Sequence, residues 1–227
     1  MIPRRWAMGF RSLSRKDQLT NIVLYLIALA VMPLGVVLTI NAHSGACGID
    51  ALNFALAERL GLNTSIGIYL TSTVILCIAA FVRRSYPHFQ CFLTAFLLGL
   101  STDVWQRILE PVQGEGIVSQ VVILMLGLVV SAFAVACYML SFFPTSANDD
   151  LLSALHDTGR SIALSKISFD AVCIVLAFLM HGEIGYGTVI CLLCLGPFID
   201  FFHHIFEKLP AVRTLHAHYG ERMANAV

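Results

Sequence analysis

Charged residues are scarce in this sequence. Lys, Arg, Asp and Glu make up 12% of the 227 residues, about half the share that soluble domains carry. Hydrophobic residues make up 58%, so the chain lacks the polar side chains that would cover a water-soluble core. The 14 basic and 14 acidic residues cancel, and we therefore expect no nucleic-acid partner. This composition predicts an integral membrane protein.

Catalytic and metal-binding motifs are also missing. The sequence has no HExxH, GxSxG or P-loop motif, each of which places reactive groups at a fixed spacing. Its seven cysteines are scattered, and the CxxC of Cys191 and Cys194 lies in an apolar run, where thiols act as small packing residues. His216 and His218 have no Cys or acid at ligand spacing around them. We predict no enzymatic activity, no metal and no cofactor.

The sequence contains several long stretches without charged residues. A helix needs about 20 mostly apolar residues to cross a bilayer, and six segments are near or beyond this length. The fifth is interrupted by Lys166 and Asp170, and we retain it because of the charge distribution described next. The fold class is therefore an all-α polytopic membrane helix bundle. The predicted spans are 20–41, 65–82, 89–109, 118–143, 162–181 and 185–206.

The distribution of basic residues supports an even number of spans. With the N-terminus inside the cell, every Lys and Arg except Arg59 and Arg107 falls in or beside a cytoplasmic segment, as the positive-inside rule requires. We expect residues 1–227 to form one membrane domain in the bacterial inner membrane. Residues 1–19 then form a basic cytoplasmic N-terminus, and residues 210–227 form a cytoplasmic tail.

Two shorter amphipathic segments, 48–61 and 146–160, lie between predicted spans. Each places leucines on one helical face and polar residues elsewhere, and each is too short to cross the membrane. Such a helix can lie on the membrane surface. It can also enter the bilayer as a re-entrant helix, which requires a cavity lined by protein. The sequence leaves both alternatives open.

The two halves of the chain share a weak repeat. GIDALNFAL, which contains Asp50, aligns with ANDDLLSAL, which contains Asp149. Further along, GLSTDVW with Asp103 aligns with GPFIDFF with Asp200. Because each half contains three spans, the second half is inverted in the membrane, an arrangement typical of secondary transporters. The first repeat covers residues 20–110 and the second covers 116–209.

Charged residues within these segments are candidates for substrate, ion or gate contacts, because a charge in hydrocarbon costs about 2.5–3.5 kcal/mol or more. Segments 99–107 and 196–204 both place a glycine, an aspartate and a basic residue at i, i+4 and i+8, on one helical face. Alternatively, each acid caps a helix or pairs with its basic neighbour and only stabilises the bundle. The candidate contacts are Asp50, Asp103, Arg107, Asp149, Lys166, Asp170, Asp200 and His204, and the candidate helix-packing residues are Gly48, Gly99 and Gly196.

Three stretches resemble a known family. SGACGIDALNFALAERLGLNTSIG, FLLGLSTDVW and IGYGTVICLLCLGPFIDFF are similar to segments of the YczE/YitT family of bacterial integral membrane proteins. The similarity runs from about residue 20 to residue 209. Ile49 departs from the pattern, since a tryptophan is expected before the aspartate. The resemblance implies a small inner-membrane protein of a group sometimes called permeases, without an established activity.

Two functions fit these observations. The first is a secondary transporter or permease that moves a small solute or ion across the lipid bilayer between the two halves. The second is a non-transporting accessory or scaffold protein that binds another membrane protein or a lipid. Gly127 and Ser131 of the fourth span would give such a protein a lipid-facing docking surface of small residues. A homo-oligomer is compatible with both.

Overall fold

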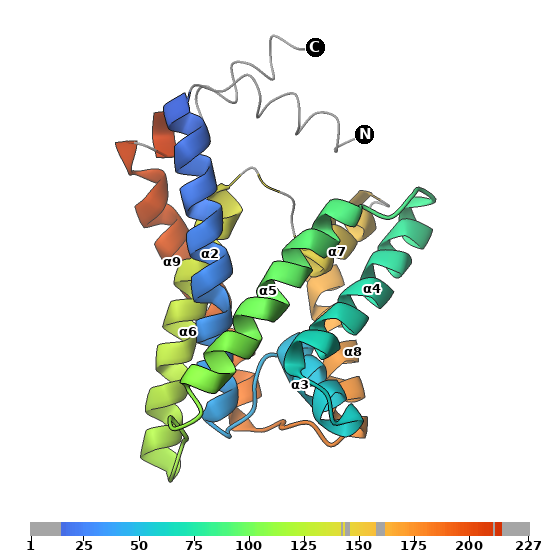
Figure 1. Ribbon diagram of the computed structural model, residues 1–227, viewed down its shortest axis with the longest axis vertical. Coiled ribbons are helices and arrows are strands. Elements are labelled where there is room, and N and C mark those ends of the chain that lie inside the picture. The colour runs from blue at the N-terminus through green and yellow to red at the C-terminus, as the bar shows by residue number, and fades with distance from the viewer. Residues whose placement is uncertain (1–14, 142, 144–145, 158–161, 211, 215–227) are drawn as a thin grey trace.

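The computed structural model describes residues 15–141, 143, 146–157, 162–210 and 212–214. Most of the predicted basic N-terminus and cytoplasmic tail lies outside these residues. Within them, all regular secondary structure is helical, in six long helices and two short ones (Figure 1). The long helices are α2 (Arg15–Asn41), α4 (Thr64–Arg83), α5 (Phe89–Ile108), α6 (Ile117–Leu140), α8 (Ile162–Leu179) and α9 (Tyr186–Glu207), and the short ones are α3 (Gly48–Leu60) and α7 (Ala147–Asp157).

Each helix coincides with a predicted segment to within a few residues. Four of them, α2, α4, α6 and α9, are long and apolar enough to cross a membrane. The other long helices each carry an acid and a base: Asp103 and Arg107 in α5, and Lys166 and Asp170 in α8. The prediction of an all-helical membrane protein is therefore supported, whereas the count of six spans stays a prediction.

Large apolar side chains cover the outside of the bundle. Phe81 on α4 is 84% exposed, Phe178 on α8 is 70% exposed and Leu193 on α9 is 69% exposed. Water-soluble monomers rarely expose extended apolar surfaces. The outer faces of these helices are instead suited to contact with lipid chains, in agreement with the composition.

The centre of one side of the bundle is the crossing of α2 and α6. A Cβ added to Gly127 would lie 2.8 Å from the carbonyl oxygen of Gly35, and the backbone of Ser131 would meet a Cβ added to Gly35 at 2.6 Å. Small residues let two helix backbones come this close. The prediction that Gly127 and Ser131 face lipid as a docking surface is therefore wrong, because α2 covers them.

The remaining helices form two groups joined by α5. Within the described chain, α9 packs on α6, α5 packs on both α2 and α4, and the short helices α3 and α7 each pack on α4 and α8. Figure 1 shows α2, α6 and α9 side by side, with α3, α4, α7 and α8 in a second group and α5 running between them. The pairs α4–α8 and α8–α9 are not among those that pack closely.

The start of α2 and the end of α9 lie at the same end of the molecule (Figure 1). At the opposite end, His43 connects three loops: its Nδ1 lies 2.8 Å from Oε1 of Glu183, and its Nε2 lies 2.7 Å from Oε1 of Gln113. The pKa of His43 is raised because the Glu183 carboxylate favours the protonated ring. Nearby, Asn41 Nδ2 donates to the Leu109 carbonyl at 2.9 Å.

Candidate functional site

The first turns of α3 and α7 line one small cavity inside the bundle. Its volume is about 70 Å³, and the remaining walls come from α2, α4 and α5. The starts of the two short helices contribute mainly polar residues to the lining, whereas α2 contributes Met32, Pro33 and Val36. The polar residues that line the cavity are Asp50, Asn53, Thr71, Ser72, Thr102, Ser146 and Asn148.

The two short helices begin differently, although their first residues align in sequence. In α7, the Ser146 hydroxyl donates to Oδ2 of Asp149 at 2.9 Å and accepts the Asp149 backbone N–H at 3.4 Å, which is a serine N-cap. In α3, the N-cap residue Cys47 makes no side-chain cap, and Asp50 lines the cavity. Asp149 therefore contributes to the helix start, whereas Asp50 is available to the cavity.

Other polar groups of the cavity are held by the surrounding helices. The Thr71 hydroxyl of α4 donates to Oδ1 of Asn53 at 2.5 Å, which fixes the orientation of the amide. On the opposite wall, Pro33 lies within α2 and removes one backbone hydrogen bond from that helix. The Trp105 indole of α5 donates to the carbonyl of Ala30 at 2.7 Å and so binds α5 to α2 near this irregularity.

Asp50 is the acid of the cavity, and the charges nearest to it come from α8. Lys166 and Asp170 lie within electrostatic range of its carboxylate. Lys166 Nζ contacts Oδ2 of Asp170 at 3.3 Å, the ion pair expected from their spacing. Among the described residues, no basic side chain lies within 4 Å of Asp50 to form a salt bridge of its own.

Asp103 caps a neighbouring helix. The backbone N–H of Ser65, in the first turn of α4, donates to Oδ1 of Asp103 at 2.9 Å, so the carboxylate satisfies one of the free amides at the helix start. Arg107 is exposed, and no ion pair within 4 Å joins it to Asp103. The expectation that Arg107 neutralises Asp103 is wrong, because the Asp103 carboxylate binds the backbone at the start of α4 instead.

We expect Asp103→Ala to destabilise the protein by about 1 kcal/mol, the usual effect of losing a helix cap. For a chain of this size the melting temperature in detergent then falls by about 2–4 °C. Arg107→Ala is the matched control and should melt within about 1 °C of the native protein, since exposed substitutions change stability little. An equal loss in both variants would contradict the assignment of Asp103 as the cap of α4.

The stripe formed by Gly196, Asp200 and His204 lies on an uncovered face of α9. A Cβ added to Gly196 would meet nothing within 4 Å, and Asp200 and His204 are exposed without an ion pair between them. The cause is the packing of α9 on α6 through a different face, where the ring centroids of Phe202 and Phe133 are 5.7 Å apart. The predicted packing role of Gly196 and the predicted Asp200–His204 pair are therefore not found within the described chain.

The other two candidate glycines lie at close helix contacts. A Cβ added to Gly48, at the start of α3, would lie 3.0 Å from the carbonyl oxygen of Asp170 in α8. One added to Gly99 would lie 3.0 Å from Cζ of Tyr69 in α4. These contacts hold α3 against α8 and α5 against α4, and so position two walls of the cavity.

The sequence interpretation missed one buried ionic cluster. Arg83 Nη1 donates to Oδ1 of Asp150 at 2.7 Å, Arg83 Nη2 donates to the Asp150 carbonyl at 2.8 Å, and His88 Nδ1 lies 2.8 Å from the same carboxylate oxygen. The Arg83 and Asp150 side chains are only 12% and 7% exposed. The cluster fixes α7 to the end of α4. The available signal was that Asp150 lies one helical turn before Ala154, on the same face of α7 as this buried residue.

No metal centre is found in the part of the chain that the structure describes, where no three His, Cys, Asp or Glu side chains gather in one place. His216 and His218 lie outside the described residues. The cavity lining offers hydroxyl and amide groups for hydrogen bonds and the carboxyl group of Asp50.

The chain is similar to uncharacterized bacterial proteins, one of which is described as a membrane protein. It is 28% identical to the uncharacterized protein YyaS of Bacillus subtilis over 81% of this chain and 92% of YyaS. It is 22% identical to the uncharacterized membrane protein YczE of the same organism, over 78% of this chain and 82% of YczE. An uncharacterized protein of Haemophilus influenzae is 23% identical over 86% of this chain and 88% of its own length.

No solved structure matches the chain. The similarity to YczE confirms the resemblance found in the sequence motifs, and together with the apolar helices it makes this an integral membrane protein. Residues 19–204, which include every residue that lines the cavity, match a family described as a family of unknown function, DUF6198. The chain belongs to the DUF6198 family.

Proposed function

We propose that this protein is a secondary transporter that carries a small solute or ion across the bacterial inner membrane, with six spans and both termini in the cytoplasm. The observation that carries the proposal is the polar cavity with Asp50, enclosed within an apolar bundle. An ionisable group inside a membrane domain is costly and commonly marks a substrate or ion pathway.

The short helices support this proposal because both begin at the cavity. Ile49 and Asp50 of α3 and Ala147 and Asn148 of α7 all line it. Interrupted or short helices that end at membrane depth present their free backbone amides to a substrate. Of the two alternatives left by the sequence, this arrangement favours re-entrant helices over helices lying on the membrane surface.

The pattern of helix packing supports two inverted repeats. When α2 to α5 are laid over α6 to α9, the packed pairs α2–α5, α3–α4 and α4–α7 correspond to α6–α9, α7–α8 and α8–α3, all of which pack. Asp50 and Asp149 then take equivalent places, each as the third residue of its short helix. The pair α2–α6 corresponds to itself in this alignment, because each helix is the first of its repeat, and the two pack on each other.

Two pairs break the correspondence. α5 packs on α7, whereas the equivalent helices α9 and α3 are not closely packed. α4 packs on α5 and is capped by its Asp103, whereas the equivalent helices α8 and α9 are not closely packed. In inverted-repeat transporters, the two halves take different conformations and exchange them to open the site to alternate sides of the membrane. An asymmetry of this kind is what a transporter in one of its two states would have.

Transport should be measured with purified protein in liposomes on a solid-supported membrane, with concentration jumps of amines, amino acids, sugars, Na⁺ and K⁺. We expect at least one solute to give a current or an internal pH change that empty liposomes lack. Asp50→Asn should reduce this signal about tenfold or more, since contacts to a charged group contribute about 1.5–3 kcal/mol.

Glu58→Gln is the matched control, because it removes a carboxylate from the exposed end of the same helix and should transport normally. A full signal in Asp50→Asn would exclude the cavity from transport. The absence of any signal from the native protein across the panel would contradict the transporter function.

The uncovered stripe of α9 favours a second candidate function, that of an accessory protein. Gly196 and Asp200 face away from every described helix, and a partner helix could cover them through small-residue packing. A stoichiometric partner that co-purifies with the native protein, but not with Gly196→Leu, would favour this function if transport is absent.

A further inference from the structure

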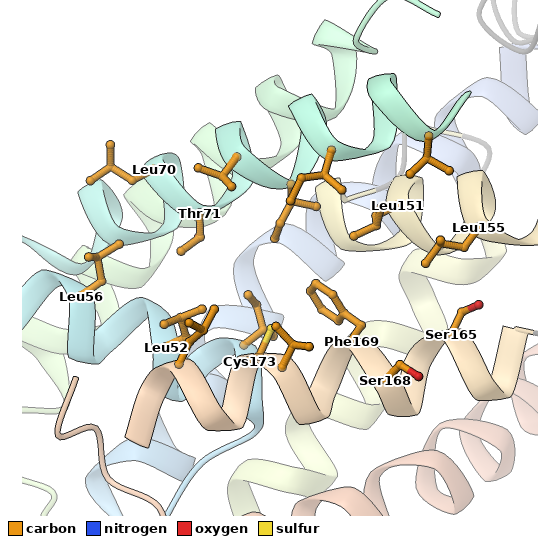
Figure 2. A pocket seen from close by; sticks show the side chains of 17 residues that line it. Leu52, Leu56, Leu70, Thr71, Leu151, Leu155, Ser165, Ser168, Phe169 and Cys173 are labelled. Atoms are coloured by element: carbon orange, nitrogen blue, oxygen red, sulfur yellow. The ribbon is translucent and has the colours of Figure 1, made fainter. Parts of the chain in front are cut away.

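A large apolar groove lies between α4 and α8, with α3 and α7 at its two ends. Its volume is about 800 Å³, within the range of sites that enclose small-molecule ligands. Figure 2 shows Thr71 of α4 across the groove from Phe169 and Cys173 of α8. The lining also includes Leu52 and Leu56 of α3 and Leu151 and Leu155 of α7.

The groove opens sideways, between the outer faces of two helices. Val74 of α4 and Val172 of α8 line it and are 58% and 57% exposed, and α4 and α8 are not closely packed on each other. In a membrane, such an opening faces lipid chains and not water. A molecule that enters it from the bilayer must therefore carry a substantial apolar part.

The groove adjoins the polar cavity. Ile49 and Thr71 line both spaces, and the Thr71 hydroxyl is already bonded to Asn53 inside the cavity. A ligand with its apolar part in the groove can therefore extend a polar group past Thr71 toward Asp50. The two spaces together have the shape of a site for an amphipathic molecule.

The charges around the cavity select the sign of that polar group. Asp50 is the acidic side chain among the residues that line the cavity, and none of these lining residues is basic. Lys166 and Asp170, which lie within electrostatic range of Asp50, are paired with each other. A cationic group is therefore the best complement to the Asp50 carboxylate.

We propose that the substrate is an amphipathic organic cation, bound with its apolar part in the groove between α4 and α8 and its charge at Asp50. It enters from the bilayer through the lateral opening. This inference rests on the transporter function proposed above and specifies the class of substrate. An ammonium or phosphonium group without other polar substituents fits a cavity as small as this one.

The test is equilibrium binding of dodecyltrimethylphosphonium to the purified full-length protein in nanodiscs, with dodecanesulfonate as an anion that carries the same apolar chain. We expect saturable binding of one phosphonium per chain and at least tenfold weaker binding of the sulfonate. Asp50→Asn should weaken phosphonium binding about tenfold or more. Asp50→Glu keeps the charge and should retain binding, which separates loss of charge from loss of fold.

Two further variants test the groove. Ser168→Trp places a bulky ring at an exposed lining position of α8 and should abolish binding. Val122→Trp places the same ring on an exposed position of α6 outside the groove and should leave binding unchanged. Equal binding of the phosphonium and the sulfonate, or unchanged phosphonium binding in Asp50→Asn or Ser168→Trp, would overturn the proposal.

This experiment separates the substrate class from the transporter function, because binding requires no transport. Phosphonium binding that depends on Asp50 and Ser168, without any current, would support the site and contradict transport. Transport of another solute that depends on Asp50, without phosphonium binding, would refute the substrate class and leave the transporter function intact.

Discussion

Asp150→Ala is expected to destabilise the protein by about 3–5 kcal/mol, the usual cost of removing one partner from a buried ion pair. The substitution leaves the Arg83 guanidinium, whose side chain is 12% exposed, without the carboxylate that lies 2.7 Å away. It also removes the acceptor of His88, which contacts the same oxygen at 2.8 Å. The melting temperature in detergent should fall by about 6 °C or more.

Two comparisons identify the cause of this loss. Asp200→Ala removes an exposed carboxylate that contacts no basic side chain in the described chain, and it should change the melting temperature little. The double variant Arg83→Met/Asp150→Leu replaces both charges by apolar groups and should recover most of the stability, because the cost comes mainly from a buried charge that has lost its carboxylate partner. A double variant as unstable as Asp150→Ala would contradict this explanation.

The helices were predictable because their limits depend on local sequence. Each apolar stretch ends at charged or turn-forming residues, so the predicted span 65–82 becomes α4, Thr64–Arg83, and the predicted segment 48–61 becomes α3, Gly48–Leu60. A helix within a membrane satisfies its own backbone hydrogen bonds, so tertiary contacts shift its ends little. Hydropathy alone does not determine the number of spans, because α5 and α8 carry charged residues that lower their mean hydropathy.

The contacts between distant residues were not predictable from spacing. The i, i+4 rule correctly paired Lys166 with Asp170, but Asp103 bonds to Ser65 and Asp150 to Arg83. These contacts connect different helices, so they depend on how the helices cross. A single sequence holds little information about those crossings.

The candidate site was predictable in part. An acid at the start of a short helix pointed to Asp50, and the structure places it in the polar cavity. The aligned acid Asp149 instead takes part in the cap of its own helix. The groove could not be predicted, since it exists because α4 and α8 stand apart, and their apolar faces resemble ordinary lipid-facing surfaces in the sequence.

The crossing of α2 and α6 gives the second large expected effect. We expect Gly127→Leu to destabilise the protein by about 3 kcal/mol or more, beyond ordinary overpacking. The reason is that the new side chain meets backbone, which cannot rotate away: its Cβ would lie 2.8 Å from the Gly35 carbonyl oxygen and 2.8 Å from the Thr39 nitrogen. The two helices would have to separate, and the groups that pack on them would move as well.

Gly196→Leu provides the matched control, with the same substitution in another long apolar helix. Its Cβ would meet nothing within 4 Å, and leucine favours a helix by up to about 1 kcal/mol over glycine. We therefore expect the melting temperature to rise slightly or stay unchanged, whereas in Gly127→Leu it falls by about 6–12 °C. The melting temperature of Gly127→Ala should lie between those of the two leucine variants, because its methyl group makes the same close contacts as the leucine Cβ but adds no further atoms. Equal melting of the two leucine variants would show that α2 and α6 do not cross at these glycines, and the arrangement of helices around the cavity would then be wrong.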